Sequence, residues 1–188
     1  GRLFILCAPS GAGKTTLCEA LRRRCPDLAY SVSYTTRRPR QGEQEGKDYF
    51  FITAEDFERG IAQGRWAEWA RVHGNYYGTS ARWVDRTLRS GGHVLMDIDL
   101  QGARQMVQRF PQAITVFIMP PSMEELGRRL RSRGTDSAET IALRMSNARE
   151  EISQSDFCRY VLVNDDLDKT IQRITALVNQ YRTVHADG

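Results

Sequence analysis

Lysine is scarce in this chain. Lys14, Lys47 and Lys169 are the only lysines among 27 basic residues, so the other 24 are arginines, and the net charge is +4. Because the planar fork of arginine grips phosphate in two places at once, this bias suggests a polyanionic substrate. A genome-wide codon bias is the plainer explanation, and we favour it for most of these arginines. No basic run or aromatic RNA-binding motif is present, which argues against a nucleic-acid partner.

Long apolar runs and cysteine motifs are also missing. No apolar stretch approaches the length of a membrane span, and the first residues show no signal-peptide pattern. Cys7, Cys18, Cys25 and Cys158 lack metal-ligand spacing, so we interpret them as reduced packing residues. Hydrophobic residues make up 40% and charged residues 27%, which is ordinary for a globular protein. We therefore expect a cytoplasmic protein that does not contact a membrane.

Short apolar runs alternate with helical patterns along most of the chain, as a parallel α/β sheet requires. The first run ends in a Gly-rich turn, and Pro26 stops the helix that follows it. We expect strands at Leu3–Cys7, Val94–Met96, Ile114–Met119 and Tyr160–Val163, with helices over Thr15–Arg24 and about Asp166–Tyr181.

Two stretches break this alternation. Residues 31–79 are aromatic-rich and alternating, with turns at Gly42, Gly46 and Gly74, which predicts a small, mostly β insertion. One helix is expected within it, opened by a near capping box that starts at Thr53. A polar, arginine-bearing helical segment at about 133–154 carries Ile141, Met145 and Ile152 as its apolar stripe, and a segment of this kind can move as a lid.

The strongest chemical signal is the Gly-rich loop between the first strand and the first helix. Small residues let backbone N–H groups curl around a phosphate, and the helix N-terminus adds partial positive charge. Lys14 is expected to reach the β- and γ-phosphates, and the Thr15 hydroxyl to ligate Mg²⁺. The first glycine of the motif is replaced by Ala8. We expect ATP contacts from Ala8, Pro9, Ser10, Gly11, Ala12, Gly13, Lys14, Thr15 and Thr16.

A second anion site is suggested by the segment 33–40, Ser-Tyr-Thr-Thr-Arg-Arg-Pro-Arg. Arg37 and Arg40 are held by a proline turn and joined by the Tyr49 hydroxyl. Together these groups could form a clamp for a second phosphate. Taken alone, two arginines three residues apart more often mark a solvated face.

With these motifs in place, the sequence resembles the guanylate kinase family, in its bacterial-type single-domain form. The resemblance runs through nearly the whole chain and includes Glu68-Trp69-Ala70, Gly74 to Thr79, Asp97 to Gly102, Arg133-Gly134-Thr135 and Asn164-Asp165-Asp166. It implies an α/β fold with a P-loop NTPase-type parallel sheet flanked by helices. It further implies a core of residues 1–30, 81–119 and 156–188, a GMP-binding domain at 31–80 and a helical lid at 120–155.

The resemblance also assigns residues. The phosphate of GMP is expected at Arg37, Arg40, Tyr49 and Tyr77. Guanine is expected at Ser33, Glu68 and Thr79, with Asp97 and Asp99 close by. The catalytic set implied is Lys14, Arg40 and the lid arginines Arg133, Arg144 and Arg149, and adenine recognition points near Asn164.

The assignment of Glu68 also makes chemical sense without the family. Guanine presents two adjacent donors, N1–H and the 2-amino group, which one carboxylate accepts together. Adenine lacks both, so bound AMP would leave a desolvated carboxylate unpaired. Asp97 and Asp99 follow the strand 94–96, where α/β proteins place ligands, and alternation predicts that they share a face. Asp97 is a candidate for the Mg²⁺ water shell, although strand-end aspartates are often only turn formers.

The expected reaction is transfer of the γ-phosphoryl group of Mg-ATP to GMP, giving ADP and GDP, a step of purine nucleotide metabolism. The expected partners are ATP and GMP, with dGMP also possible, and the chain is expected to be a monomer or a homodimer. Three alternatives stay open: a phosphopeptide-binding scaffold of the same fold, a kinase with another acceptor, and a nucleic-acid-dependent ATPase. The intact loop at 11–15 favours an enzyme over the scaffold.

Overall fold

The computed structural model describes residues 1–72, 74–132, 134 and 136–183. Within them, the larger sheet has five strands, and every neighbouring pair is parallel. Its order across the sheet is β2 (Leu28–Tyr30), β7 (His93–Asp97), β1 (Leu3–Cys7), β8 (Ile114–Met119) and β9 (Tyr160–Val163).

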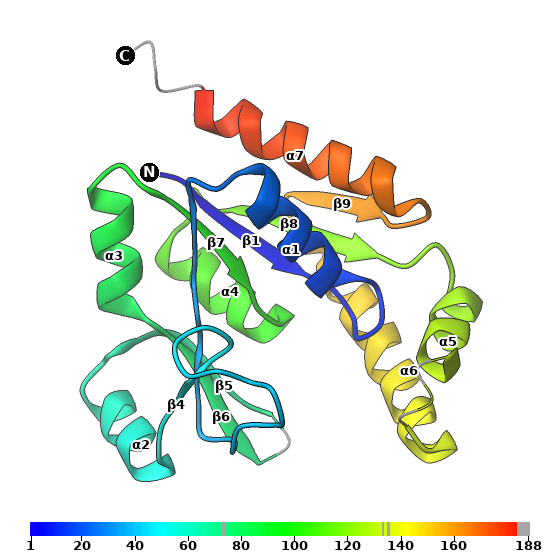
Figure 1. Ribbon diagram of the computed structural model, residues 1–188, viewed down its shortest axis with the longest axis horizontal. Helices are drawn as coiled ribbons and strands as arrows, with labels where there is room; N and C mark the ends of the chain where they lie inside the picture. Colours follow the sequence, from blue (N-terminus) through cyan, green and yellow to red (C-terminus); the bar gives the residue numbers. More distant parts are fainter. Residues whose placement is uncertain (73, 133, 135, 184–188) are drawn as a thin grey trace.

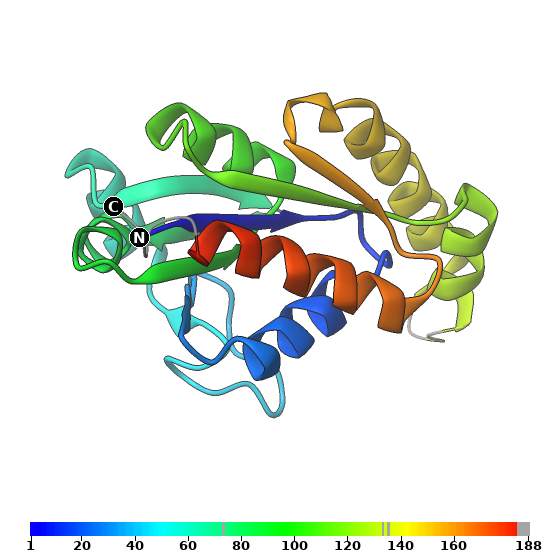
Figure 2. The ribbon, with the colours of Figure 1, turned by 90° about the horizontal axis from the view of Figure 1, so that it is seen from above.

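Helices cover both faces of this sheet, as Figure 2 shows for α1 and α7 on one side and α4 on the other. The two faces follow from alternation along β1, because successive side chains of a strand point in opposite directions. Phe4 and Leu6 pack with α1 (Lys14–Arg24) and α7 (Leu167–Thr183). Leu3, Ile5 and Cys7 pack with α3 (Ala81–Arg89) and α4 (Leu100–Arg109). Burial on both faces explains why β1 is a continuous apolar run.

A smaller sheet lies below the core in Figure 1. Its order is β4 (Phe50–Phe51), β3 (Tyr34–Thr35), β6 (Asn75–Ser80) and β5 (Trp66–Val72), with β6 antiparallel to both neighbours. Helix α2 (Ala54–Ala62) packs on it through Phe57, whose ring stacks on Trp66 and Tyr76. The expected cap is present, because the Thr53 hydroxyl accepts a hydrogen bond from the Asp56 N–H at 3.1 Å.

Two helices form a separate pair at the far end of the core, on the right in Figure 1. They are α5 (Met123–Ser132) and α6 (Ala138–Ser153), and a 3₁₀ turn (Ser155–Phe157) returns the chain to β9. Ile141 and Met145 pack on Leu126 and Leu130 of α5. Ile152 instead contacts the core beneath the larger sheet, so the apolar stripe of α6 serves two clusters.

The predicted fold class is confirmed: a parallel sheet flanked by helices carries a mostly β insertion. The strands predicted at Leu3–Cys7, Ile114–Met119 and Tyr160–Val163 have those bounds, and α7 runs from Leu167 to Thr183. The strand β2 was not predicted, since its three residues carry too little pattern. In the described part of the chain, no helix is long and apolar enough to cross a membrane. The domain boundaries stay a prediction.

Candidate functional site

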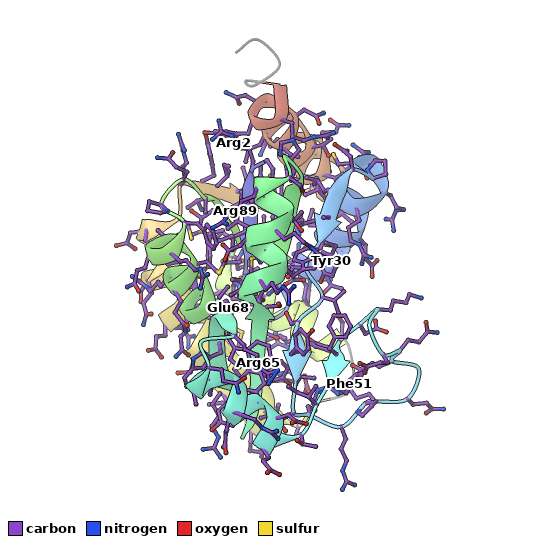
Figure 3. All side chains as sticks on the ribbon, turned by 90° about the vertical axis from the view of Figure 1, so that its left-hand side faces the viewer. Arg2, Tyr30, Phe51, Arg65, Glu68 and Arg89 are labelled. Carbon is purple, nitrogen blue, oxygen red and sulfur yellow. The ribbon has the colours of Figure 1, made fainter. Side chains whose placement is uncertain are left out.

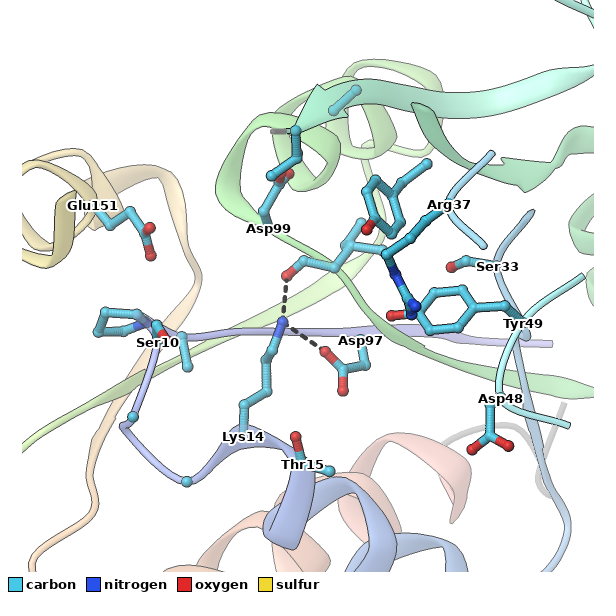
Figure 4. A pocket seen from close by; sticks show the side chains of 18 of the residues that line it. Ser10, Lys14, Thr15, Ser33, Arg37, Asp48, Tyr49, Asp97, Asp99 and Glu151 are labelled. Atoms are coloured by element: carbon cyan, nitrogen blue, oxygen red, sulfur yellow. Dashed lines mark hydrogen bonds and ion pairs between the residues drawn. The ribbon is translucent and has the colours of Figure 1, made fainter. Parts of the chain in front are cut away.

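A cleft of about 550 Å³ opens where the larger sheet, the smaller sheet and α6 face one another. Figure 4 shows side chains from all three parts converging on it. Most of the residues expected from the sequence line it. They are Ala8, Pro9, Ser10, Gly11, Gly13, Lys14, Thr15, Thr16, Ser33, Arg37, Arg40, Tyr49, Glu68, Tyr77, Asp97 and Asp99.

The Gly-rich loop connects β1 to α1 at one wall of the cleft. Gly13 caps α1 with a φ of 96°, a left-handed conformation that favours glycine. A side chain there would also collide with Asn164, whose Nδ2 atom lies 2.6 Å from an ideal Cβ position. The buried Asn164 amide donates to the Ala12 carbonyl at 2.8 Å, so it supports the loop from behind. Ala12 and Asn164, both expected to contact ATP, thus bond to each other behind the loop and do not line the cleft.

Lys14 meets Asp97 because their strands are neighbours in the sheet. Leu6 of β1 pairs with Asp97 at the carboxyl end of β7, so the loop after β1 passes above that carboxylate. The Lys14 Nζ atom lies 2.6 Å from Asp97 Oδ1 and donates to the Ile98 carbonyl at 3.2 Å (Figure 4). Burial alone would lower the pKa of Lys14, but the charge of Asp97 and its hydrogen bond outweigh burial and raise it. Lys14 is therefore a fixed cation in the cleft.

Asp97 and Asp99 both line the cleft, but not for the predicted reason. The strand ends at Asp97, so alternation does not extend to Asp99. Asp99 is the N-cap of α4, and its carboxylate accepts from the Gly102 N–H at 2.7 Å. Asp97 thus faces Lys14, whereas Asp99 shapes the start of a helix.

Arg37 is held in place by an acidic neighbour that the sequence analysis did not single out. Its Nη1 and Nη2 atoms donate to the two oxygens of Glu43 at 3.0 and 2.8 Å, and Nη1 also donates to the Arg38 carbonyl at 2.9 Å. These contacts use three of the five N–H donors of a guanidinium, and Tyr77 also hydrogen-bonds with it. The Glu43 hydrogen bonds raise the pKa of Arg37, while Arg37 and the Arg40 N–H lower that of Glu43.

Aromatic residues complete this side of the cleft. The Arg37 guanidinium lies 5.3 Å from the centre of the Tyr49 ring, and Tyr49 meets Tyr77 edge to face at 5.9 Å. Burial raises the pKa of the Tyr49 hydroxyl, which therefore stays protonated and able to donate. With the exposed Arg40 at the rim, this group forms a cationic corner that carries hydrogen-bond donors.

Glu68 pairs with Thr79 through an irregularity in β5. The register shifts between Trp66 and Glu68, so that Glu68 stands directly opposite Thr79 on β6. The Thr79 hydroxyl donates to Glu68 Oε1 at 2.6 Å, and both side chains are buried. Figure 3 labels Glu68 at the level where the smaller sheet meets the core helices. Thr79 itself lies outside the cleft lining, behind the carboxylate that it supports.

Burial perturbs the acidity of Glu68 strongly. Desolvation raises its pKa to about 7; the Thr79 hydrogen bond opposes this shift, and the charge of Asp99 adds to it. A buried carboxylate with a raised pKa in a cleft is a candidate functional group, because burying a carboxylate is costly.

The two predicted lid arginines that the structure describes do not line the cleft. Arg133 lies outside the described residues. Arg144 is ion-paired with Asp136 at 3.1 Å, and Arg149 is exposed on α6; neither lines the cleft.

Glu151 does line the cleft and was missed. It lies about two helical turns after Arg144 on α6, a spacing that places it on the same face of the helix. Figure 4 shows its carboxylate directed at the Gly-rich loop. Burial raises its pKa to about 7, which the charge of Lys14 partly offsets.

Comparison with known proteins agrees with this geometry. A sequence model of the guanylate kinase family matches residues 1–181. A guanylate kinase of Geobacter sulfurreducens is 48% identical over 178 residues, which are 95% of this chain and 88% of that protein. One of Vibrio parahaemolyticus is 50% identical over 184 residues, 97% of this chain and 89% of that protein. The crystal structure of guanylate kinase from Anaplasma phagocytophilum superposes with a TM-score of 0.77 at 34% identity, covering 97% of this chain and 87% of that one. The chain belongs to the guanylate kinase family.

Proposed function

We propose that this chain transfers the γ-phosphoryl group of ATP to the phosphate of GMP, giving ADP and GDP. Guanylate kinases are ATP:GMP phosphotransferases, and the family membership supports the same activity here. The observation that carries the proposal is a single cleft lined by both Lys14 of the Gly-rich loop and the buried carboxylate of Glu68. An ATPase without a guanine substrate would not need the buried carboxylate of Glu68.

ATP is proposed to bind with its phosphates in the loop 8–16. Backbone N–H groups of the loop and the N-terminus of α1 face the phosphates, and Lys14 neutralises their charge. Binding replaces the Asp97 carboxylate by phosphate oxygens around the Lys14 ammonium.

GMP is proposed to bind at the smaller sheet. Its phosphate binds Arg37, Arg40 and the hydroxyls of Tyr49 and Tyr77. Its guanine edge donates from N1–H and the 2-amino group to Glu68, with Ser33 and Asp99 nearby.

The chemistry requires no general base. The attacking group is a phosphate oxygen of GMP, which is already largely dianionic at neutral pH because the second pKa of a phosphate ester is about 6. A bond forms from that oxygen to the γ-phosphorus, and the bond to the bridging oxygen breaks with its electron pair left on ADP. The residues contribute positioning and charge neutralisation, which offset the repulsion between two polyanions.

The donor set fits Mg²⁺. The Thr15 hydroxyl and the Asp97 carboxylate are hard oxygen donors in the cleft, and Mg²⁺ prefers oxygen ligands. Among the described residues, no three acidic, histidine or cysteine side chains gather as a protein metal cage. A metal here would therefore rely on phosphates and water, as Mg²⁺ commonly does. When bound, it supplies charge neutralisation on the β- and γ-phosphates.

We also propose that residues 31–80 form the GMP-binding domain and that residues 120–155 close over the cleft as a lid. The ion pair of Arg144 with Asp136 and the exposure of Arg149 support a closing step, because both arginines must move to meet the phosphates. Arg133 is assigned to the same role. Cytoplasmic location, dGMP as a second substrate, adenine contact near Asn164 and a monomeric or dimeric state stay predictions.

Phosphoryl transfer with a panel of acceptors tests the proposal. ADP formation from Mg-ATP is measured with GMP, AMP, CMP or UMP, for the natural protein, for Lys14→Ala and for Lys169→Ala. The last variant is a matched control, because Lys169 is exposed on α7 and is not one of the residues that line the cleft.

We expect turnover with GMP alone, lowered roughly a hundredfold or more in Lys14→Ala and unchanged in Lys169→Ala. Folded natural protein that binds GMP but forms no ADP with any acceptor would refute the proposal and favour a scaffold. Equal turnover with AMP and GMP would refute the role of Glu68.

A further inference from the structure

Helix α4 lies against β5, the strand that carries Glu68. Within the described part of the chain, β5 pairs only with β6 in the smaller sheet, so no strand partner lies at its other edge. Two adjacent residues of an antiparallel strand direct their main-chain groups to opposite sides. The main chain of Trp69, the residue after Glu68, therefore points to this edge and towards α4.

Gln105 of α4 occupies that edge as a neighbouring strand would. Its side-chain oxygen accepts from the Trp69 N–H at 3.1 Å, and its side-chain nitrogen donates to the Trp69 carbonyl at 2.8 Å. An amide has the same donor and acceptor pair as a peptide group, so one side chain satisfies both main-chain groups. The contact fixes β5 relative to α4 at the position next to Glu68.

Gly102, one turn earlier on α4, leaves the space that the Glu68 carboxylate fills. An ideal Cβ on Gly102 would lie 2.6 Å from Glu68 Oε2 and 3.2 Å from its Cδ. The backbone of Gly102 is ordinary helix, so its conformation does not require glycine. The space is needed because Thr79 holds the opposite oxygen at 2.6 Å and the carboxylate is buried.

We propose that helix α4 positions the carboxylate of Glu68 for guanine selection, with Gln105 and Gly102 as its positioning residues. Neither residue touches the nucleotide; both act through Glu68, and the inference rests on the proposed function. Gln105 fixes strand β5, and Thr79 fixes Oε1 of Glu68. Because Gly102 has no side chain, Oε2 of Glu68 can lie against helix α4. The carboxylate is thereby held before guanine arrives, so that little ordering is left for the binding step.

The same contacts join the two ends of the cleft. The N-cap of helix α4 is Asp99, two residues after the partner of Lys14, and the Asp99 carboxylate accepts a hydrogen bond from the Gly102 N–H. A displacement of α4 therefore changes the distance between the base-reading carboxylate and the phosphate-binding lysine.

The test compares GMP with IMP, which lacks the 2-amino group but keeps N1–H. The ratio of kcat/KM for the two acceptors measures how well Glu68 accepts both donors, and a general loss of stability leaves that ratio unchanged. It is measured for the natural protein, Gln105→Met, Gly102→Ala and the control Gln108→Met, which makes the same substitution at an exposed position of α4.

We expect the ratio to fall about tenfold in Gln105→Met and in Gly102→Ala, the factor for one misplaced hydrogen bond to a charged group. The KM for ATP and the ratio in Gln108→Met stay unchanged. Alanine forms helix better than glycine, so Gly102→Ala keeps α4 intact if Gln105→Met does not fold. An unchanged ratio in either folded variant, when the natural protein phosphorylates GMP, overturns the inference alone. No turnover of GMP by the natural protein refutes the proposed function, and the inference falls with it.

Discussion

Replacing Glu68 by glutamine is expected to make the protein more stable above neutral pH, although it removes the carboxylate proposed to bind guanine. The carboxylate is buried, and desolvation raises its pKa from 4.5 to about 7 in the folded chain. The unfolded chain exposes it, so there it ionises at the lower value. Between these two values the folded state binds a proton that the unfolded state has released.

The sign and size of the effect follow from this difference. A raised carboxyl pKa contributes stability that is fully present below pH 4.5 and is lost as the pH rises to about 7. Each pKa unit corresponds to about 1.4 kcal/mol, so the loss is about 3 kcal/mol at pH 8. Glutamine carries no charge to bury and does not suffer this loss. Its amide oxygen still accepts from Thr79.

Urea unfolding of the natural protein and Glu68→Gln, at several pH values from 5 to 8, measures the difference directly. We expect the variant to gain up to about 3 kcal/mol relative to the natural protein across this range. Other titrating groups, such as Glu151, are common to both proteins and cancel in the difference. The control Glu55→Gln makes the same substitution at an exposed position in the first turn of α2. A flat difference for Glu68→Gln, or one of opposite slope, would refute the reasoning.

Two further predictions concern the phosphate side of the cleft and the lid. Glu43→Gln removes the charged partner that holds Arg37, so the KM for GMP is expected to rise about tenfold with little change for ATP; an unchanged KM would show that Arg37 is fixed without Glu43. Labels on cysteines introduced at Leu143 of α6 and Glu55 of α2 are expected to approach each other when a non-hydrolysable ATP analogue and GMP bind together. Equal distances with and without nucleotides would contradict closure.

Features that depend on local sequence were predictable. The Gly-rich loop is readable because its glycines, lysine and threonine are contiguous, and the structure places Gly13 in the left-handed conformation that the motif needs. The short, continuous apolar runs that form β1 and β8 are buried on both faces, and this burial explains why they could be recognised as strands.

Features that depend on distant residues were not predictable in the same way. The shift in β5 that brings Glu68 opposite Thr79 depends on pairing with β6, and no residue type encodes it. From the sequence, Gly102 only lowers helix propensity. The reason for a glycine there is the buried Glu68 carboxylate, which lies beside it only in the folded chain. Glu151 reads as one more charge on a polar helix, because only tertiary packing turns that face of α6 towards the loop.

The contact between Gln105 and Trp69 also bears on how this protein behaves at high concentration. An exposed strand edge is a template on which a second chain can add, and natural proteins shorten or cover such edges. In the smaller sheet one edge is β4, which is two residues long, and the other is β5, whose Trp69 main chain is already bonded to α4. A foreign strand would have to displace Gln105 before it could pair with β5 at Trp69. The side chain that we propose positions Glu68 therefore also covers the edge of this sheet at Trp69.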